Sequence, residues 1–174
     1  MKSVLFHSTV MLATLSTLLF SGQFAHAQSV EKGTDAAYIG GGLSAGVTNG
    51  GQNGDAANLG GNIQGRYQIE DTPVSVRGAI LFGEETSAIM PMVSYDLPVA
   101  QNTNVYVGAG YSFVEADGQP SPLGNRDSFM VTVGGESQVA ENIVVYGDGK
   151  WGINAYENSS ADALSFQAGV GYRF

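Results

Sequence analysis

The chain has 174 residues, no cysteine and a formal net charge of −9. A chain of this length is expected to form one domain. The missing cysteines exclude disulfides and thiolate chemistry. The acidic balance argues against a nucleic acid partner, because phosphate binding needs a basic surface.

The N-terminal residues have the composition of a secretory signal. Lys2 precedes a leucine-rich apolar stretch at residues 10–20, and the Ala-His-Ala sequence at residues 25–27 is a small-x-small cleavage site. The apolar stretch is shorter than the roughly 18 residues that a membrane-spanning helix needs, so a retained anchor is the weaker interpretation. We therefore expect residues 1–27 to be a cleaved signal peptide and residues 28–174 to be the exported domain.

After this segment, apolar and polar residues alternate along the chain. In residues 58–69, Ile63 and Tyr67 fall on one face of an extended strand, and Gln64 and Arg66 fall on the other. The alternation recurs in eight segments: residues 37–47, 58–69, 74–82, 89–97, 105–113, 129–136, 143–153 and 164–174. Each has about the ten residues that a tilted strand needs to cross a bilayer. The pattern predicts an all-β fold, an eight-stranded antiparallel up-and-down transmembrane β-barrel.

The connections between these segments differ in length and fall into two groups. The long, polar ones are residues 48–57, 115–127 and 154–161, and the tight ones are residues 70–73 and 139–142. Outer-membrane barrels have long loops outside and short turns in the periplasm. Two connections depart from this rule, because residues 84–87 are short for an outer loop and residues 98–104 are long for an inner turn.

The outward aromatic residues separate by depth into two belts when the chain is placed with its start in the periplasm. The periplasmic belt contains Tyr67, Tyr95, Tyr172 and Phe174, and the outer belt contains Phe82, Phe113, Phe129, Trp151 and Phe166. Only Tyr111 falls nearer the middle. Two aromatic girdles are typical of a transmembrane barrel, whereas a soluble β-sandwich, the alternative all-β fold, gives no reason for them.

Charged residues on the opposite, lumenal face form a second pattern. They are Arg66, Arg77, Asp96, Glu136, Asp148, Lys150 and Arg173. An eight-stranded barrel is only wide enough for side chains to fill, and unpaired charges there would be costly. We expect an ion-pair network that plugs the lumen, and the alternative is a narrow pore that uses the same charges.

No catalytic, cofactor or metal site is predicted. The only histidines, His7 and His26, lie within the expected signal peptide, which excludes a histidine-dependent triad in the exported domain. The glycine-rich residues 40–46 lack the strand before and the helix after that a phosphate-binding loop requires.

The expected outer loops are acidic. Their carboxylates are Asp55, Glu84, Glu85, Glu115, Asp117, Asp127, Glu157 and Asp162, with Arg126 as the only base. Such acids could bind divalent cations that bridge to lipopolysaccharide phosphates. None has the spacing of a dedicated calcium site, so a solvated, repulsive surface is the simpler interpretation.

Several short segments resemble the small OmpA/OmpX-type and opacity-type outer-membrane barrels. They are Tyr-Ile-Gly-Gly-Gly-Leu at 38–43, Tyr-Asp-Leu-Pro at 95–98, Val-Tyr-Val-Gly-Ala-Gly-Tyr at 105–111 and Gly-Val-Gly-Tyr-Arg-Phe at 169–174. Val170, Tyr172 and the terminal Phe174 resemble the signal that the barrel assembly machinery recognises. The resemblance implies an integral outer-membrane protein that contacts this machinery during assembly.

The expected function follows from these patterns. The protein is predicted to be a monomeric structural or loop-presenting component of the Gram-negative outer membrane, with a filled lumen and no catalytic activity. Its expected partners are outer-membrane lipid, lipopolysaccharide and the assembly machinery. The alternative is a narrow, porin-like pore for ions or small solutes.

Overall fold

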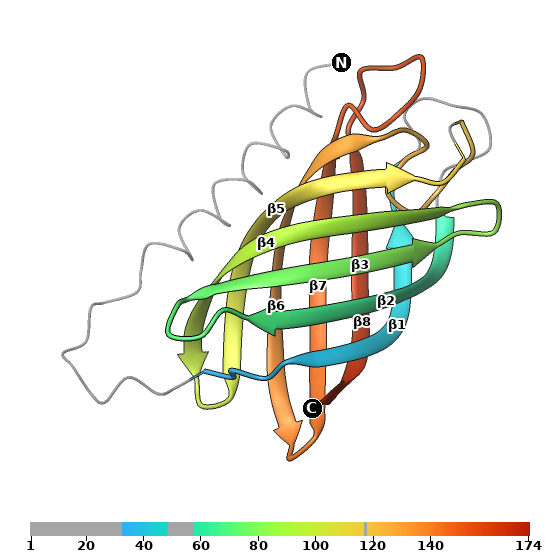
Figure 1. Ribbon diagram of the computed structural model, residues 1–174. Coiled ribbons are helices and arrows are strands. Elements are labelled where there is room, and N and C mark those ends of the chain that lie inside the picture. Colours follow the sequence, from blue (N-terminus) through green and yellow to red (C-terminus); the bar gives the residue numbers. More distant parts are fainter. Residues whose placement is uncertain (1–32, 49–57, 117) are drawn as a thin grey trace, which may run out of the picture. The chain divides into compact units, whose positions relative to one another are not determined.

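The computed structural model describes residues 33–48, 58–116 and 118–174. The expected signal peptide, residues 1–27, and residues 49–57 of the first long connection lie outside this part. Within it, eight antiparallel strands form a closed barrel in which β8 pairs with β1 (Figure 1). The strands are β1 (Tyr38–Gly46), β2 (Asn58–Gln68), β3 (Val74–Phe82), β4 (Ser87–Ala100), β5 (Thr103–Val114), β6 (Ser128–Ala140), β7 (Ile143–Ile153) and β8 (Ala163–Arg173). The predicted fold class is confirmed.

Alternation along each strand separates a lumenal face from an outer face. On β3, Ser75 and Arg77 are buried, whereas the intervening Val76 is 51 % exposed. Because successive side chains of a strand point to opposite faces, closing the sheet places one set inside and the other outside. The outer face is apolar, which is the reverse of a soluble protein. Among the described residues, no helix is long and apolar enough to cross a membrane.

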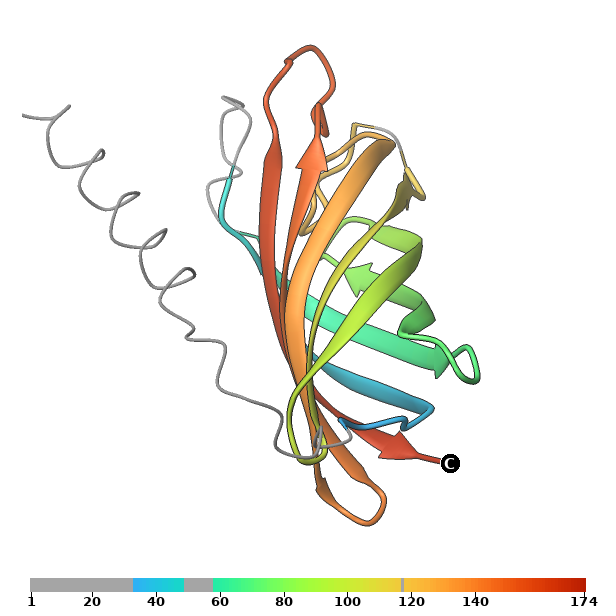
Figure 2. The same ribbon diagram turned by 90° about the vertical axis from the view of Figure 1, so that its left-hand side faces the viewer.

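The two ends of the barrel differ in their connections. The β7–β8 connection lies at the opposite end from the C-terminus in both views (Figures 1 and 2). We call the end with the C-terminus and the short turns the inner end, and the end with the long connections the outer end. The connection between Phe82 and Ser87 lies at the outer end and is short, as expected from the sequence.

The inner turn between β4 and β5 is tighter than the alternation predicts. β4 continues to Ala100 and β5 begins at Thr103, so residues 98–104 form no long connection, and the prediction of one is wrong. Asn102 closes this turn with a φ of 61°, a left-handed conformation that asparagine tolerates better than most residues. The pairing register shifts between Pro98 and Ala100, so a bulge extends β4 beyond the last alternating residue.

Candidate functional site

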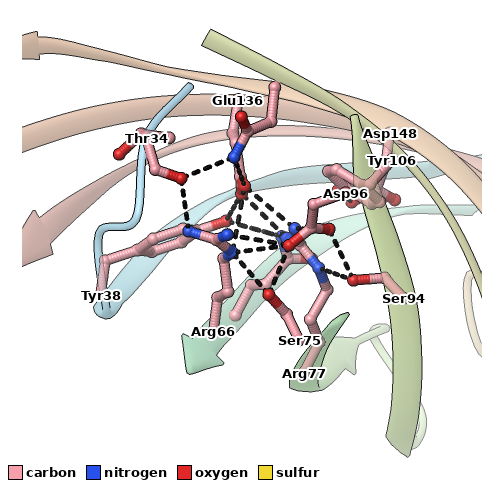
Figure 3. Close-up of polar contacts among 12 residues, drawn as sticks. Thr34, Tyr38, Arg66, Ser75, Arg77, Ser94, Asp96, Tyr106, Glu136 and Asp148 are labelled. Atoms are coloured by element: carbon pink, nitrogen blue, oxygen red, sulfur yellow. Dashed lines mark hydrogen bonds and ion pairs between the residues drawn. The ribbon is translucent and has the colours of Figure 1, made fainter. Parts of the chain in front are cut away.

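The inner half of the lumen is crossed by a charge layer, which we define as Arg66, Arg77, Asp96 and Glu136 (Figure 3). These residues lie on β2, β3, β4 and β6, and alternation directs each of them inward. None of the four is more than 3 % exposed. The layer therefore spans the lumen from strands on several sides.

Each arginine of the charge layer pairs with both carboxylates. Arg66 lies 2.8 Å from Asp96 (Nη2–Oδ2) and 3.1 Å from Glu136 (Nε–Oε1). Arg77 lies 3.0 Å from Asp96 (Nη2–Oδ1) and 2.9 Å from Glu136 (Nη1–Oε2). Two positive and two negative groups thus neutralise one another, which offsets the cost of burying them.

Neutral side chains complete the hydrogen bonding of the charge layer. Ser75 donates to Asp96 Oδ2, and Ser94 donates to Asp96 Oδ1 at 2.8 Å. The Tyr38 hydroxyl donates to Glu136 Oε2 at 3.0 Å. Arg77 Nε donates to Ser94 Oγ at 2.7 Å (Figure 3). A buried network of this kind is stabilising only when its members are satisfied, and these additional bonds meet that condition.

The chain before β1 contributes backbone acceptors to the same layer. Arg66 Nη1 donates to the carbonyl oxygens of Thr34 and Ala36, at 3.3 and 2.9 Å. Asn104 Nδ2 also donates to the Thr34 oxygen, at 2.6 Å. Thr34 and Ala36 are buried. This segment therefore contributes to closing the inner end, a role that sequence reasoning missed because the segment has no strand periodicity.

A second ion pair lies next to the charge layer. Lys150 Nζ is 2.5 Å from Asp148 Oδ1, and the Tyr106 hydroxyl donates to Asp148 Oδ2 at 2.9 Å. The guanidinium carbon of Arg77 lies 3.6 Å from the centroid of the Tyr106 ring, in cation–π geometry. Tyr106 thus joins the second pair to the charge layer.

Arg173 is placed differently from the other six predicted charges. Its side chain is 34 % exposed and pairs with the exposed Asp35 at 3.1 Å (Nη2–Oδ1). It also donates to Gln138 Oε1 at 2.6 Å. Since Arg173 ends β8, it lies at the inner rim, and the expectation that it shares the lumenal network needs correction. Among the described residues, the buried charges are three positive and three negative, namely Arg66, Arg77, Lys150, Asp96, Glu136 and Asp148.

The outer end of the lumen is closed by a different structure, which we call the outer plug. Leu123, from the β5–β6 connection, is fully buried in one apolar cluster with lumenal strand residues. The strand members of this cluster are Ala79, Leu81, Ala88, Met90, Met92, Val114, Met130 and Ala163. Ala155 and Tyr156 of the β7–β8 connection complete it. The sequence marks residues 115–127 as a polar outer loop, so the inward position of Leu123 was missed.

Hydrogen bonds hold the loops of the outer plug together. Asn125 N–H donates to the Ala155 oxygen at 3.0 Å, and its Oδ1 accepts from Glu157 N–H at 2.8 Å. Asn58 Nδ2 donates to the Pro120 oxygen at 3.1 Å. These bonds join the start of β2 and two connections far apart in sequence, so Leu123 is supported from several sides.

The predicted girdle residues all lie on the outer face. The exposed aromatic side chains are those of Tyr67, Tyr95, Tyr172, Phe174, Phe82, Phe113, Phe129, Trp151 and Phe166. Tyr111, expected nearer the middle, packs against Phe113 and Phe129 with centroid distances of 4.8 and 5.0 Å. It is therefore part of the aromatic cluster near the outer end of β5 and β6.

The three residues of the predicted assembly signal lie on or beside the strand that closes the barrel. Val170, Tyr172 and Phe174 are all exposed on the outer face. The Phe174 N–H donates to the Ala37 oxygen at 3.1 Å, which extends the β1–β8 pairing beyond the end of β8.

The described loop carboxylates do not gather into a cation site. The part of the chain that the structure describes has no group of three or more potential metal-ligating residues. Glu115 accepts from the Ser87 hydroxyl at 2.6 Å, Asp127 from Val114 N–H at 2.8 Å, and Asp162 from Asn154 N–H at 2.9 Å. Asp55 and Asp117 lie outside the described residues. Three of the acids thus support local loop structure.

Comparisons with known proteins agree with this geometry. The family model described as "Outer membrane protein beta-barrel domain" matches residues 12–174. No curated protein is a significant match. The solved structures described next are 10–17% identical to this chain, and at such low identity they show a shared fold alone.

Three of these solved structures come from bacterial outer-membrane or surface proteins. OprG from Pseudomonas aeruginosa has a TM-score of 0.56 at 10% identity, covering 84% of this chain and 99% of that chain. Neisserial surface protein A has a TM-score of 0.55 at 16% identity, covering 83% and 100%. Ail, the attachment invasion locus protein of Yersinia pestis, has a TM-score of 0.53 at 17% identity, covering 81% and 100%.

Proposed function

Because the chain belongs to the outer-membrane β-barrel family, whose model matches residues 12–174, we propose that it is a structural component of the outer membrane. In this proposal the barrel presents its outer loops at the cell surface, its lumen is closed to solutes, and it has no catalytic activity. The only histidines are His7 and His26. No described part of the lumen pairs a nucleophile with a histidine base.

The observation that carries this proposal is the double closure of the lumen. The charge layer fills the inner half, and the outer plug places Leu123 among buried methionines at the outer end. A continuous water path would have to separate buried ion pairs, and breaking such a pair costs about 3–5 kcal/mol. It would also have to withdraw a loop that hydrogen bonds join to its neighbours. These barriers favour a closed barrel over a pore.

A narrow pore is the second candidate, and the sharing of partners within the charge layer favours it. Each arginine contacts two carboxylates. One contact could therefore break while the other holds the charge, so a rearranged lumen would cost less than a full separation of the pairs. This candidate predicts permeability to small solutes.

Liposome swelling tests the two candidates. The purified, folded protein is reconstituted into vesicles and exposed to gradients of small sugars, with a porin reconstituted in the same way as the positive control. The proposal expects swelling no faster than that of protein-free vesicles. Swelling that depends on protein amount and on sugar size would instead establish the pore.

Export, assembly and lipid contacts complete the proposal. Residues 1–27 direct export and are then removed, and Val170, Tyr172 and Phe174 are read by the barrel assembly machinery. Outer-membrane lipid and lipopolysaccharide surround the exposed aromatic side chains of a monomeric barrel. Outer-membrane fractionation tests this part: the protein should cofractionate with the outer membrane and run as a compact band on gels until it is boiled. A soluble periplasmic product would contradict it.

A further inference from the structure

One wall of the lumen carries buried polar atoms without a protein partner. Within the described residues, no hydrogen bond reaches the side-chain oxygens of Ser112, Ser128, Thr132 and Ser165, or either polar atom of the Gln167 side chain. All five residues are at least nine-tenths buried. An unsatisfied buried polar group is costly and rare in native proteins, so this concentration on β5, β6 and β8 needs a physical explanation.

Strand register places three of these side chains beside the Lys150–Asp148 pair. Lys150 is paired with Thr132 on β6 and with Ser165 on β8, and Asp148 is paired with Gln167 on β8. Directly paired residues of neighbouring antiparallel strands have Cβ atoms roughly 4.5–5.5 Å apart. Thr132, Ser165 and Gln167 therefore form one contiguous polar patch around the ion pair on the β6–β8 wall, whereas Ser112 and Ser128 are paired with each other nearer the outer end.

Lys150 has donor capacity left for this patch. Its ammonium group has three protons, and its partners among the described residues are Asp148 Oδ1 at 2.5 Å and Gln64 Oε1 at 3.5 Å. Hydroxyls and the glutamine amide can both donate and accept. The patch thus offers donors and acceptors with a balanced charge, since Lys150 is neutralised by Asp148.

We propose that this patch, defined as Thr132, Asp148, Lys150, Ser165 and Gln167, holds a small cluster of internal water molecules. Water can donate and accept, and a buried water molecule typically makes two to four hydrogen bonds to groups of this kind. An anion would meet Asp148 as well as Lys150, so the balanced charge favours a neutral ligand. The charge layer on one side and the outer plug on the other restrict its exchange with bulk solvent.

The first test is the sign of a stability change. Thr132→Val keeps the side-chain shape and removes only the hydroxyl. If that hydroxyl binds water, the unfolding equilibrium constant in phospholipid vesicles should rise by roughly fivefold, with a lower urea midpoint. If the Thr132 hydroxyl has no hydrogen-bond partner at all, its removal stabilises the barrel. An unchanged or raised midpoint would therefore overturn the proposal.

Thr34→Val is the matched control for this test. Thr34 is also buried, but its hydroxyl accepts from Ala36 N–H at 3.1 Å and donates to Gln138 Oε1 at 3.4 Å. Its removal should lower the midpoint whether or not water occupies the lumen, which calibrates the assay.

The second test observes the water directly. In lipid nanodiscs, NMR should detect a cross-peak between water and the side-chain amide of Gln167, which has no protein partner among the described residues. A resolved Gln167 side-chain amide without a water cross-peak would contradict the proposal. Neither test depends on whether the barrel conducts.

Discussion

At the inner end of the lumen, two arginines and two carboxylates close the cross-section, whereas at the outer end Leu123 of a loop packs among methionines. The inner closure is built from strand side chains joined by short, directional contacts. The outer closure is apolar and is delivered by a connection. The contrast shows that one barrel can be closed by electrostatic pairing at the end with short turns and by hydrophobic burial at the end where its long loops meet.

The largest expected effect comes from breaking the inner closure. Glu136→Ala removes one carboxylate from both arginines and an acceptor from the Tyr38 hydroxyl. The free energy of unfolding should fall by about 3–5 kcal/mol, because a buried positive charge loses compensation. Urea titration in phospholipid vesicles measures the change.

The matched control is Glu141→Ala, which removes an exposed carboxylate from an inner turn and should alter stability by less than about 0.5 kcal/mol. Equal effects of the two substitutions would show that the charge layer contributes no special stability.

Truncating the outer plug should cost less than breaking the charge layer. Leu123→Ala is expected to lower the free energy of unfolding by about 2 kcal/mol, the lower end for a buried leucine, because a loop can partly collapse into the space. Leu59→Ala on the outer face, where the leucine is 74 % exposed, should cost only about 0.5 kcal/mol. Thermal unfolding followed by gel mobility compares the two variants. If Leu59→Ala were as costly as Leu123→Ala, the outer plug would not be a packed core.

A steric substitution tests the packing between the two closures. A Cβ at Gly169 would clash with the Tyr146 ring and would lie 2.7 Å from the Gly41 carbonyl oxygen, so Gly169→Ala must displace both the ring and the neighbouring backbone. We expect a loss of about 1–3 kcal/mol. Gly78→Ala is the control, since a Cβ there has no heavy atom within 4 Å. Urea midpoints that did not distinguish the two variants would contradict the close packing of Tyr146 against Gly169.

The smallest effect on folded stability is expected at the C-terminus. Phe174 is 75 % exposed, so Phe174→Ala should change the stability of the assembled barrel by about 0.5 kcal/mol or less. The amount of the Phe174→Ala variant in the outer membrane should nevertheless fall severalfold if the assembly machinery recognises this residue. Quantifying the heat-modifiable band in membrane fractions checks this, and an undiminished yield would remove Phe174 from the assembly signal.

Strand alternation was sufficient to predict the barrel and the inward direction of the charge layer. The family resemblance inferred from residues such as the terminal Phe174 is confirmed by the match to the outer-membrane β-barrel model. Arg66 and Arg77 could be placed in the lumen because each lies on the polar face of a period-two segment. The partners of these arginines could not be predicted, because Glu136 lies 59 residues from Arg77 in sequence and contacts it only when the sheet closes.

The missed features lie where periodicity ends. Thr34 and Ala36 precede β1 and bind through backbone carbonyls, which no side-chain pattern records. Leu123 is a single apolar residue in a polar connection, so its burial depends on loop packing. Arg173 continues the alternation of β8, but its position at the strand end lets it reach Asp35 at the rim instead of the lumen.

Single-channel recording in planar lipid bilayers tests the closure of the lumen most directly. The wild-type barrel, inserted at densities at which a porin control gives discrete steps, should produce no stepwise openings, because the charge layer and the outer plug both block the lumen. Reproducible stepwise openings of uniform conductance would contradict the closed-barrel account.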